Sequence, residues 1–127
     1  MTNDNTVLQT LFDIVRTLRG EQGCPWDKKQ TCASLTQYLQ SECDELILAI
    51  KNNDHRNICE ELGDVLYVLI MISEINKDRE LFDFSDVVRT INEKLVRRHP
   101  HVFDGQPYES EEQLAVQWQQ IKANERK

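Results

Sequence analysis

The stretch CEELGDVLYVLIMI, residues 59–72, decides how the rest of this 127-residue chain is interpreted. Its eight consecutive apolar residues, 65–72, suit either a buried parallel strand or a helix that is buried on all sides. The pattern continues from about residue 57 to 75 with no break except Gly63, which is long for a strand, and no convincing second strand is present to pair with it. We therefore predict a helix here and an all-α fold, a helical bundle.

The remaining helices are predicted by apolar periodicity and by helix end signals. Gly20 is expected to cap the first helix at its C-terminus, residues 20–30 to form a loop, and Pro100 to end the helix before it. Side chains that favour a helix N-terminus precede the later helices: Thr31 or Ser34, Asp54, Ser85 and Ser110. Ser110 with Gln113 has the spacing of a capping box.

Composition and charge predict one folded domain, residues 1–127, and limit its partners. The chain is 39% hydrophobic and 29% charged, which is typical of a globular domain. Its net charge of −7 argues against a nucleic-acid polymer as partner, because such binding depends on Lys and Arg neutralising phosphates. A nucleotide stays compatible with this charge, because a divalent cation can supply positive charge locally.

The sequence predicts a cytoplasmic protein without a membrane partner. The first ten residues, MTNDNTVLQT, lack the basic and apolar regions of a secretory signal. The longest apolar run is far shorter than the ~20 residues needed to span a bilayer. The four cysteines form no Cys-x-x-Cys pair, and reduced thiols are typical of the cytoplasm.

Two acidic pairs stand among apolar residues of the second and third long helices. Glu42 and Glu45 are three residues apart, as are Glu61 and Asp64, so each pair projects from one helix face. The fifteen residues between the second and third of these acids leave room for a turn between antiparallel helices. The two pairs can then face each other and bind Mg²⁺ or Mn²⁺, which prefer carboxylate and water ligands.

Two other interpretations of these acids must be weighed. Acids three residues apart are common on solvated helix faces, and a chain with 29% charged residues offers many by chance. A di-iron carboxylate bundle would need Glu-x-x-His motifs, and none of His55, His99 and His101 has a glutamate three residues before it. The spacing therefore favours a Mg²⁺ site over a di-iron site, with a solvated acidic face as the remaining alternative.

Five segments, in order, resemble the MazG family of nucleoside triphosphate pyrophosphohydrolases. They are GCPWDKKQT, the Glu-x-x-Glu and Glu-x-x-Asp pairs, EELGDVLY, EKLVRRHPHVF and WQQIKANERK, spread over residues 18–127. The resemblance implies an all-α MazG-like fold that oligomerises, typically as a homodimer. It also implies Mg²⁺-dependent hydrolysis of a nucleoside triphosphate, (d)NTP, to the monophosphate and pyrophosphate, a house-cleaning activity.

The resemblance also assigns roles to single residues. Those that match the family's metal ligands are Glu42, Glu45, Glu61 and Asp64. Those that match positions associated with substrate are Glu60, Lys94, Arg98, Trp118 and Lys122. The first three acids are also catalytic candidates, because a carboxylate that is not fully used by the metal can accept a proton from the attacking water. The basic side chains would balance the charge of the triphosphate.

Several of these residues also have structural interpretations. Trp118 or Trp26 can stack on a base, but Trp118 also has the spacing of a core residue and Trp26 can anchor its loop. Arg97 and Arg98 can bind phosphate or favour the negative C-terminal end of their helix.

One position departs from the family pattern. The first acidic motif usually opens with two adjacent glutamates, and Ser41 replaces the first of them here. This replacement puts the number of metals and the turnover in question. It makes possible a second hypothesis beside the enzyme, a non-catalytic nucleotide- or metal-binding module on the same scaffold. A third hypothesis is a purely structural helical oligomer whose acids are surface charges.

Overall fold

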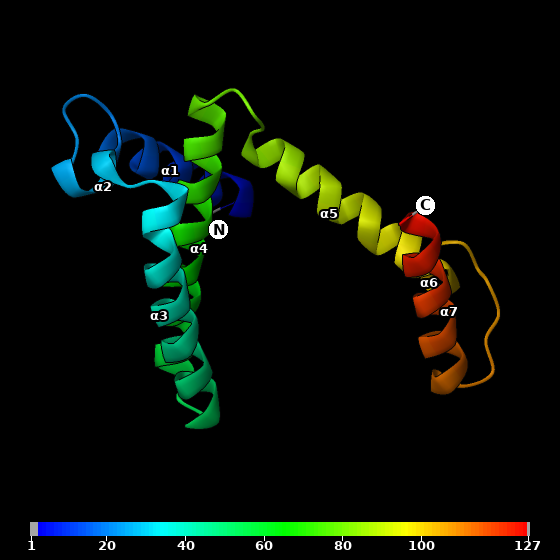
Figure 1. Cartoon of the computed structure of the whole chain (residues 1–127). Helices are drawn as coiled ribbons and strands as arrows, with labels where there is room; N and C mark the ends of the chain where they lie inside the picture. The colour runs from blue at the N-terminus through cyan, green and yellow to red at the C-terminus, as the bar shows by residue number, and fades with distance from the viewer. Residues whose placement is uncertain (1–2, 127) are drawn as a thin grey trace. The chain divides into compact units, whose positions relative to one another are not determined.

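The structure is a computed structural model that describes residues 3–126, and all regular secondary structure in this part of the chain is helical (Figure 1). In chain order the helices are α1 (Asp4–Leu18), α2 (Pro25–Lys29), α3 (Cys32–Lys51), α4 (His55–Asp78), α5 (Phe84–Arg98), α6 (Pro100–Phe103) and α7 (Glu111–Glu125). The predicted all-α fold is confirmed, and the apolar run 65–72 is helical. No helix of the described range is long and apolar enough to cross a membrane.

The chain forms two compact units, Met1–Phe84 and Ser85–Lys127. The sequence predicts one domain over residues 1–127 that would include both units, and this stays a prediction. The first unit contains α1 to α4 and the second contains nearly all of α5 together with α6 and α7.

The first unit is built on an antiparallel pair, α3 and α4, which lie side by side (Figure 1). As predicted, α3 begins after Thr31, whose hydroxyl accepts a hydrogen bond from the Ser34 backbone N–H while Ser34 Oγ accepts one from the Thr31 N–H. Asp54 caps α4, also as predicted, by accepting a hydrogen bond from the Asn57 backbone N–H at 3.3 Å. Between the two helices Asn53 adopts φ 54°, a left-handed conformation in which asparagine is enriched.

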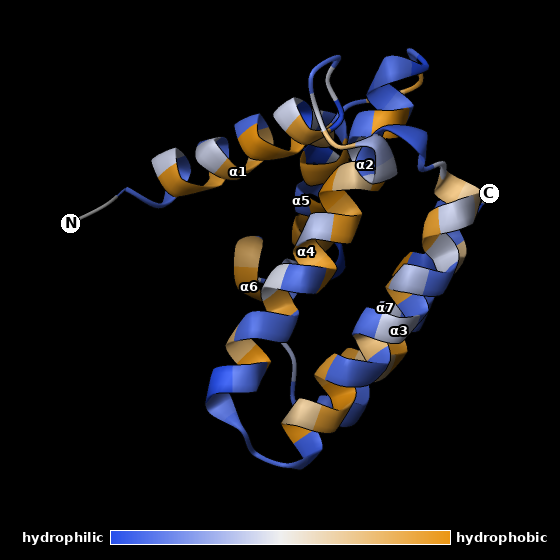
Figure 2. Ribbon diagram, turned by 90° about the vertical axis from the view of Figure 1, so that its left-hand side faces the viewer, coloured by the Kyte–Doolittle hydropathy of each residue, from blue (hydrophilic) through white to orange (hydrophobic). Residues whose placement is uncertain are grey.

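The core of this unit lies where α1 packs against the C-terminal half of α4 and the start of α3. Apolar and polar segments alternate along these helices (Figure 2), as expected where one face of each is buried. The buried apolar side chains are Val15, Leu35, Val68, Ile70, Met71 and Ile75. Each contributes about 1.5–3 kcal/mol when fully buried, so this cluster fixes the relation between α3 and α4.

The segment between α1 and α3 is more ordered than the predicted loop. It contains α2, with Pro25 in its first turn. The buried Asp27 carboxylate accepts a hydrogen bond from the Tyr67 hydroxyl of α4, and Arg19 donates to the Asp27 carbonyl at 2.6 Å. These contacts hold the segment against α4, which sequence periodicity could not reveal.

The expected glycine cap of α1 is wrong. The C-cap is Arg19, whose backbone N–H donates to the Val15 carbonyl, and the next N–H, that of Gly20, donates to the Thr17 carbonyl. The glycine that the turn requires is Gly23, because a Cβ there would clash with the Leu18 carbonyl. The chain thus leaves α1 through a tight turn that depends on Gly23, and Gly20 does not serve as the cap.

The second unit joins α5, α6 and α7. Helix α5 begins at Phe84, so the expected N-cap Ser85 lies inside the helix, whereas Pro100 ends α5 as predicted and opens the short α6. Ser110 caps α7 as predicted and accepts from the Gln113 backbone N–H at 3.1 Å. The Gln113 side chain takes its hydrogen bond from the Glu109 N–H at 2.6 Å instead of closing the box at Ser110.

Candidate functional site

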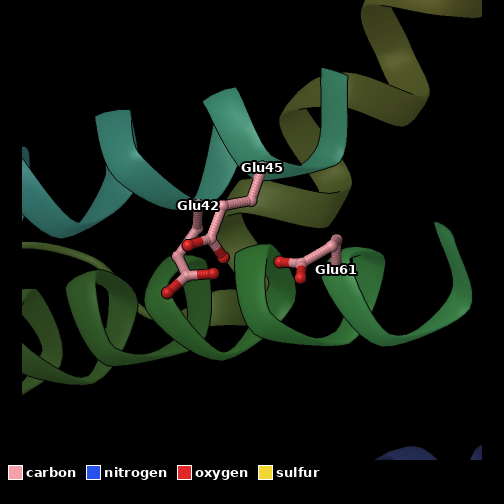
Figure 3. Close-up of side chains that lie close together, drawn as sticks. All are labelled: Glu42, Glu45 and Glu61. Carbon is pink, nitrogen blue, oxygen red and sulfur yellow. The ribbon is translucent and has the colours of Figure 1, made fainter. Parts of the chain in front are cut away.

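Three of the four predicted metal ligands converge between α3 and α4. Glu42 and Glu45 extend from α3 toward α4, and Glu61 extends from α4 toward them (Figure 3). One carboxylate oxygen from each residue lies within 4.8 Å of the others. The spacing of three on α3 brings the first two together, and the antiparallel pairing of the helices adds the third.

Two of these carboxylates are under electrostatic strain. Glu42 Oε2 and Glu61 Oε2 are buried and accept no hydrogen bond from the part of the chain that is described. Burial, followed by the negative charge of Glu45, raises the pKa of Glu61 from 4.5 to about 7. The same two causes raise the pKa of Glu42. Like charges that are partly shielded from water favour a bound cation.

A contrast with Glu74 shows that this strain is local to the three acids. Glu74 is more deeply buried than they are, but Arg16 Nη2 lies 3.3 Å from its Oε1. The fold therefore supplies a counter-charge to one buried acid, and no such ion pair is found for Glu42, Glu45 or Glu61 among residues 3–126. Because burying an unpaired carboxylate is costly, the group fits a hard divalent cation.

The fourth predicted ligand, Asp64, lies outside this close group. Its side chain is exposed, yet its negative charge contributes to the raised pKa values of Glu42 and Glu61. Asp64 is therefore near the group, and its role as a ligand stays a prediction.

A small cavity adjoins the acidic group at the turn between α3 and α4. It has a volume of about 160 Å³, enough for a few waters at roughly 30 Å³ each. Glu45 and Glu61 line it together with Asn52, Asp54 and Asn57. Sequence analysis identified Asp54 only as a helix cap and attached no role to the two asparagines, because nothing in their spacing indicates that the turn borders the acids.

Comparison with known proteins gives the family. The family model of the MazG nucleotide pyrophosphohydrolase domain matches residues 30–103, which include all four predicted metal ligands. The chain belongs to the MazG family. The resemblance drawn from the five sequence segments is thus confirmed.

Two curated relatives and one solved structure are similar over most of this chain. It is 46% identical over 120 residues to the nucleoside triphosphate pyrophosphohydrolase/pyrophosphatase MazG of Thermotoga maritima and 38% identical over 120 residues to the nucleoside triphosphate pyrophosphohydrolase of Escherichia coli. Each match covers 94% of this chain and 46% of the relative, so the chain spans less than half the length of either. The crystal structure of a MazG-related protein from Thermotoga maritima matches with a TM-score of 0.74 and 30% identity, over 91% of this chain and 98% of that one.

The candidate substrate residues of this MazG chain lie mainly on α5 and α7, in the second unit. Lys94 and Arg98 are four residues apart and share a face of α5, where both are half-buried. On α7, Lys122 Nζ lies 5.3 Å from the centroid of the Trp118 ring, a cation–π contact. Trp118 is 45% exposed, so the core role considered for it is wrong, and its stacking on a base stays a prediction.

The two candidate substrate residues of the first unit differ from each other. Trp26 packs edge-on against Tyr38, with ring centroids 5.0 Å apart, and against the core cluster. It therefore anchors its segment, and any contact with a base stays a prediction. Glu60 is exposed on α4 next to Glu61, and its role with substrate also stays a prediction.

A further acid, Glu125 of α7, was not singled out by sequence analysis. Its carboxylate contacts Arg97 Nε at 2.6 Å and Arg98 Nη2 at 2.8 Å. It falls inside the segment WQQIKANERK, and two adjacent arginines near a helix end can take a counter-charge from an acid of another helix. Which acid supplies that charge depends on how α7 folds back on α5, and local spacing cannot give this.

Proposed function

We propose that this domain is a Mg²⁺-dependent nucleoside triphosphate pyrophosphohydrolase, which converts a (d)NTP to the (d)NMP and pyrophosphate. The observation that carries the proposal is the convergence of Glu42, Glu45 and Glu61, of which the first and the last each have a buried oxygen without a hydrogen-bond partner in the described chain. Membership of the MazG family and the activity for which the two curated relatives are named support it.

The acidic group would hold the metal ion and take part in proton transfer. Glu42, Glu45 and Glu61 would hold Mg²⁺, or Mn²⁺ as a substitute, with Asp64 as an additional acid nearby. A bound ion would neutralise charge on the phosphate oxygens and lower the pKa of water. A carboxylate oxygen of this group that the ion does not use would accept the proton of the attacking water.

Basic side chains of the second unit would bind the phosphate chain. Lys94, Arg98 and Lys122 supply the positive charge that phosphate transfer requires, and a guanidinium can bind two oxygens at once. Trp118 would stack on the base, a contact that tolerates different bases. Glu60 and Trp26 would make further contacts with the substrate.

We also propose that the protein is a homodimer or a higher homo-oligomer. In α5, which has no buried residue, four apolar side chains recur at helical spacing and are 38–46% exposed: Val87, Val88, Ile91 and Leu95. A second copy would remove this stripe from water. Sedimentation equilibrium should give at least a dimer, and Ile91→Glu should dissociate it; a monomeric wild type would contradict the proposal.

The proposed location is the cytoplasm. All four cysteines are unpaired, as expected in a reducing compartment.

The activity is tested by pyrophosphate release from a panel of ribo- and deoxyribonucleoside triphosphates. Each is measured with Mg²⁺, with Mn²⁺ and with chelator, and the nucleotide product is identified by chromatography. We expect metal-dependent release of pyrophosphate in equal amount with the monophosphate. Asp44→Asn is the matched control for the substitution of an acid in the acidic group, such as Glu61→Gln. Asp44 is an exposed acid of α3 that accepts a hydrogen bond from Gln40.

The same assay separates the alternatives. A protein that is stabilised against heat by Mg²⁺ but releases no pyrophosphate would be a binding module, since a ligand of the native state raises its stability whether or not catalysis follows. A protein with neither property would be a structural oligomer whose acids bind no metal.

A further inference from the structure

The second unit contains a charge cluster that brings two arginines of α5 to one acid of α7. Arg98 donates to Glu125 through Nη2 at 2.8 Å and through Nε at 3.3 and 3.4 Å to the two oxygens. Arg97 donates through Nε at 2.6 Å. The Arg98 and Glu125 side chains are only 17% and 19% exposed, so this contact is held within the unit instead of at its surface.

The bonding pattern leaves part of each guanidinium available. Glu125 occupies the Nε side of both groups, and a guanidinium has five N–H donors of which four are on its two Nη atoms. Neither Arg97 Nη atom nor Arg98 Nη1 donates a hydrogen bond to any residue from 3 to 126. These outer edges have the planar, forked geometry that suits phosphate oxygens.

The surroundings allow a ligand to approach. Arg97 and Glu125 line a cavity of about 780 Å³ in the second unit, together with polar residues of α7 such as Gln117 and Gln120. The Arg97 side chain is 49% exposed. Arg97 and Glu125 therefore border open space, whereas Arg98 lies behind them and does not line this cavity.

We infer that Glu125 is a positioning residue that orders Arg97 and Arg98 so that their free Nη edges bind the phosphate chain of the substrate. This inference rests on the proposed function for the identity of the ligand. It gives a role to Glu125, which the family resemblance left without one, and it adds Arg97 to Arg98 as a phosphate contact.

The opposite possibility is that Glu125 competes with phosphate for the arginines. The geometry favours positioning, because the carboxylate takes the Nε sides and leaves the outer edges free. Two long side chains that are ordered before binding lose less entropy when the ligand arrives. The two guanidinium groups also lower the pKa of Glu125 to about 2, so the carboxylate stays charged at neutral pH.

When the charge of Glu125 is removed, a positioning role and a simple net-charge effect predict changes of opposite sign in the affinity for phosphate. Removal of a negative charge near a phosphate site should strengthen binding if only net charge matters. If Glu125 orders the arginines, its removal should weaken binding. Glu112→Gln is the matched control, because Glu112 is an exposed acid in the first turn of the same helix and its loss changes the net charge equally.

The experiment measures the Kd of inorganic tripolyphosphate by titration calorimetry, with saturating Mg²⁺, for wild type, Glu125→Gln and Glu112→Gln. We expect Glu125→Gln to raise Kd by about 5- to 100-fold, the loss that follows when two long side chains must be ordered on binding. Glu112→Gln should leave Kd unchanged or slightly lower. An unchanged or lower Kd for Glu125→Gln would overturn the inference.

A second comparison separates positioning from a general structural role. In an Arg97→Lys, Arg98→Lys background, Glu125→Gln should no longer raise Kd, because no guanidinium remains to be oriented. A persistent increase would overturn the inference. If Glu125→Gln does not fold, as judged by circular dichroism, Glu125→Asp replaces it; this variant keeps the charge but shortens the reach by one methylene, and a Kd equal to wild type would count against positioning.

The outcome is distinguishable from failure of the proposed function. If wild type binds tripolyphosphate without hydrolysing any nucleotide, and Glu125→Gln weakens that binding, the inference stands and the catalytic proposal fails. If wild type hydrolyses nucleotides and Glu125→Gln leaves KM unchanged, the inference fails and the activity stands. Where both hold, Glu125→Gln should raise KM with little change in kcat.

Discussion

The acidic group between α3 and α4 and the charge cluster that joins α5 to α7 differ in whether their carboxylates have positively charged partners. Glu42, Glu45 and Glu61 are gathered with no positive side chain paired to them in the described chain, and burial with mutual repulsion raises the pKa of Glu61 to about 7. Glu125 has two arginines, and its pKa falls to about 2. The negative charge of a carboxylate that is paired with arginines is already balanced by the protein. The charge of a group of unpaired carboxylates is balanced when a cation binds.

The largest expected effect is on metal binding by Glu61→Gln. This change removes one charge from the acidic group at nearly constant shape. Loss of a residue that merely supports a metal ligand costs about 10- to 100-fold in affinity, so loss of a ligand should cost at least about 100-fold for Mn²⁺ and should abolish pyrophosphate release. The metal-free variant should nevertheless have a higher Tm than wild type, because repulsion is relieved.

Calorimetric Mn²⁺ titration and thermal unfolding in chelator check both parts. Asp44→Asn, on the exposed side of α3, should change neither value. Wild-type affinity in Glu61→Gln would show that the three acids are not the metal site.

Asp64→Asn should have a smaller effect than Glu61→Gln. Asp64 is exposed and lies outside the close group, but it acts on Glu42 and Glu61 through its charge. We expect a loss of about tenfold in Mn²⁺ affinity, the size associated with residues that support a ligand. A loss as large as that of Glu61→Gln would make Asp64 a ligand and would mean that the metal-bound site is more closed than the three-residue group.

The pH dependence of stability should have opposite signs in the two regions. For Glu61 the folded pKa is raised from 4.5 to about 7, so the metal-free folded state binds a proton that the unfolded chain has released, and stability falls as pH rises between these values. For Glu125 the folded pKa is lowered from 4.5 to about 2, so its contribution is present above pH 4.5 and is lost as pH falls toward 2.

Thermal unfolding of the metal-free protein from pH 2 to 8 tests this pair of signs. Glu61→Gln should reduce the decline in stability between pH 4.5 and 7, and Glu125→Gln should reduce the loss of stability below pH 4.5. Saturating Mg²⁺ should also remove the decline, because the ion holds the carboxylates deprotonated. Equal pH profiles for wild type and both variants would refute the contrast.

The smallest expected effect is that of Ser41→Glu, which restores the acid that the family pattern has at this position. Ser41 is exposed and borders a shallow groove with Gln37, Gln40 and Asp44. It lies one helical turn from Glu45, so an added charge could assist the acidic group. We expect turnover to rise by at most about fivefold, because an exposed charge interaction is worth roughly 1 kcal/mol or less.

Initial rates of pyrophosphate release at saturating Mg²⁺ measure this change, with Ser41→Gln as a control of similar size and no charge. An unchanged or lower rate would mean that the site works with serine.

Local sequence determined the helices and several of their ends. Thr31, Asp54 and Ser110 act as predicted caps because an N-cap contacts backbone only two or three residues away. Glu42 and Glu45 share a face for the same reason, since neighbours on a helix are set by its own period. The failures at Gly20 and Ser85 are also local, where a neighbouring residue ended or began the helix instead.

Only the tertiary structure decided which distant side chains meet. It brought Glu61 to the two acids of α3 and left Asp64 outside, it turned Trp26 toward Tyr38, and it gave Arg97 and Arg98 their counter-charge in Glu125. The period of a helix says which residues share a face, but the rotation and offset of one helix against another are set by the packing of side chains such as Leu35 and Met71. The sequence therefore determined that this chain carries acids and arginines on its helices, and packing determined that the acids stand together unpaired while the arginines do not.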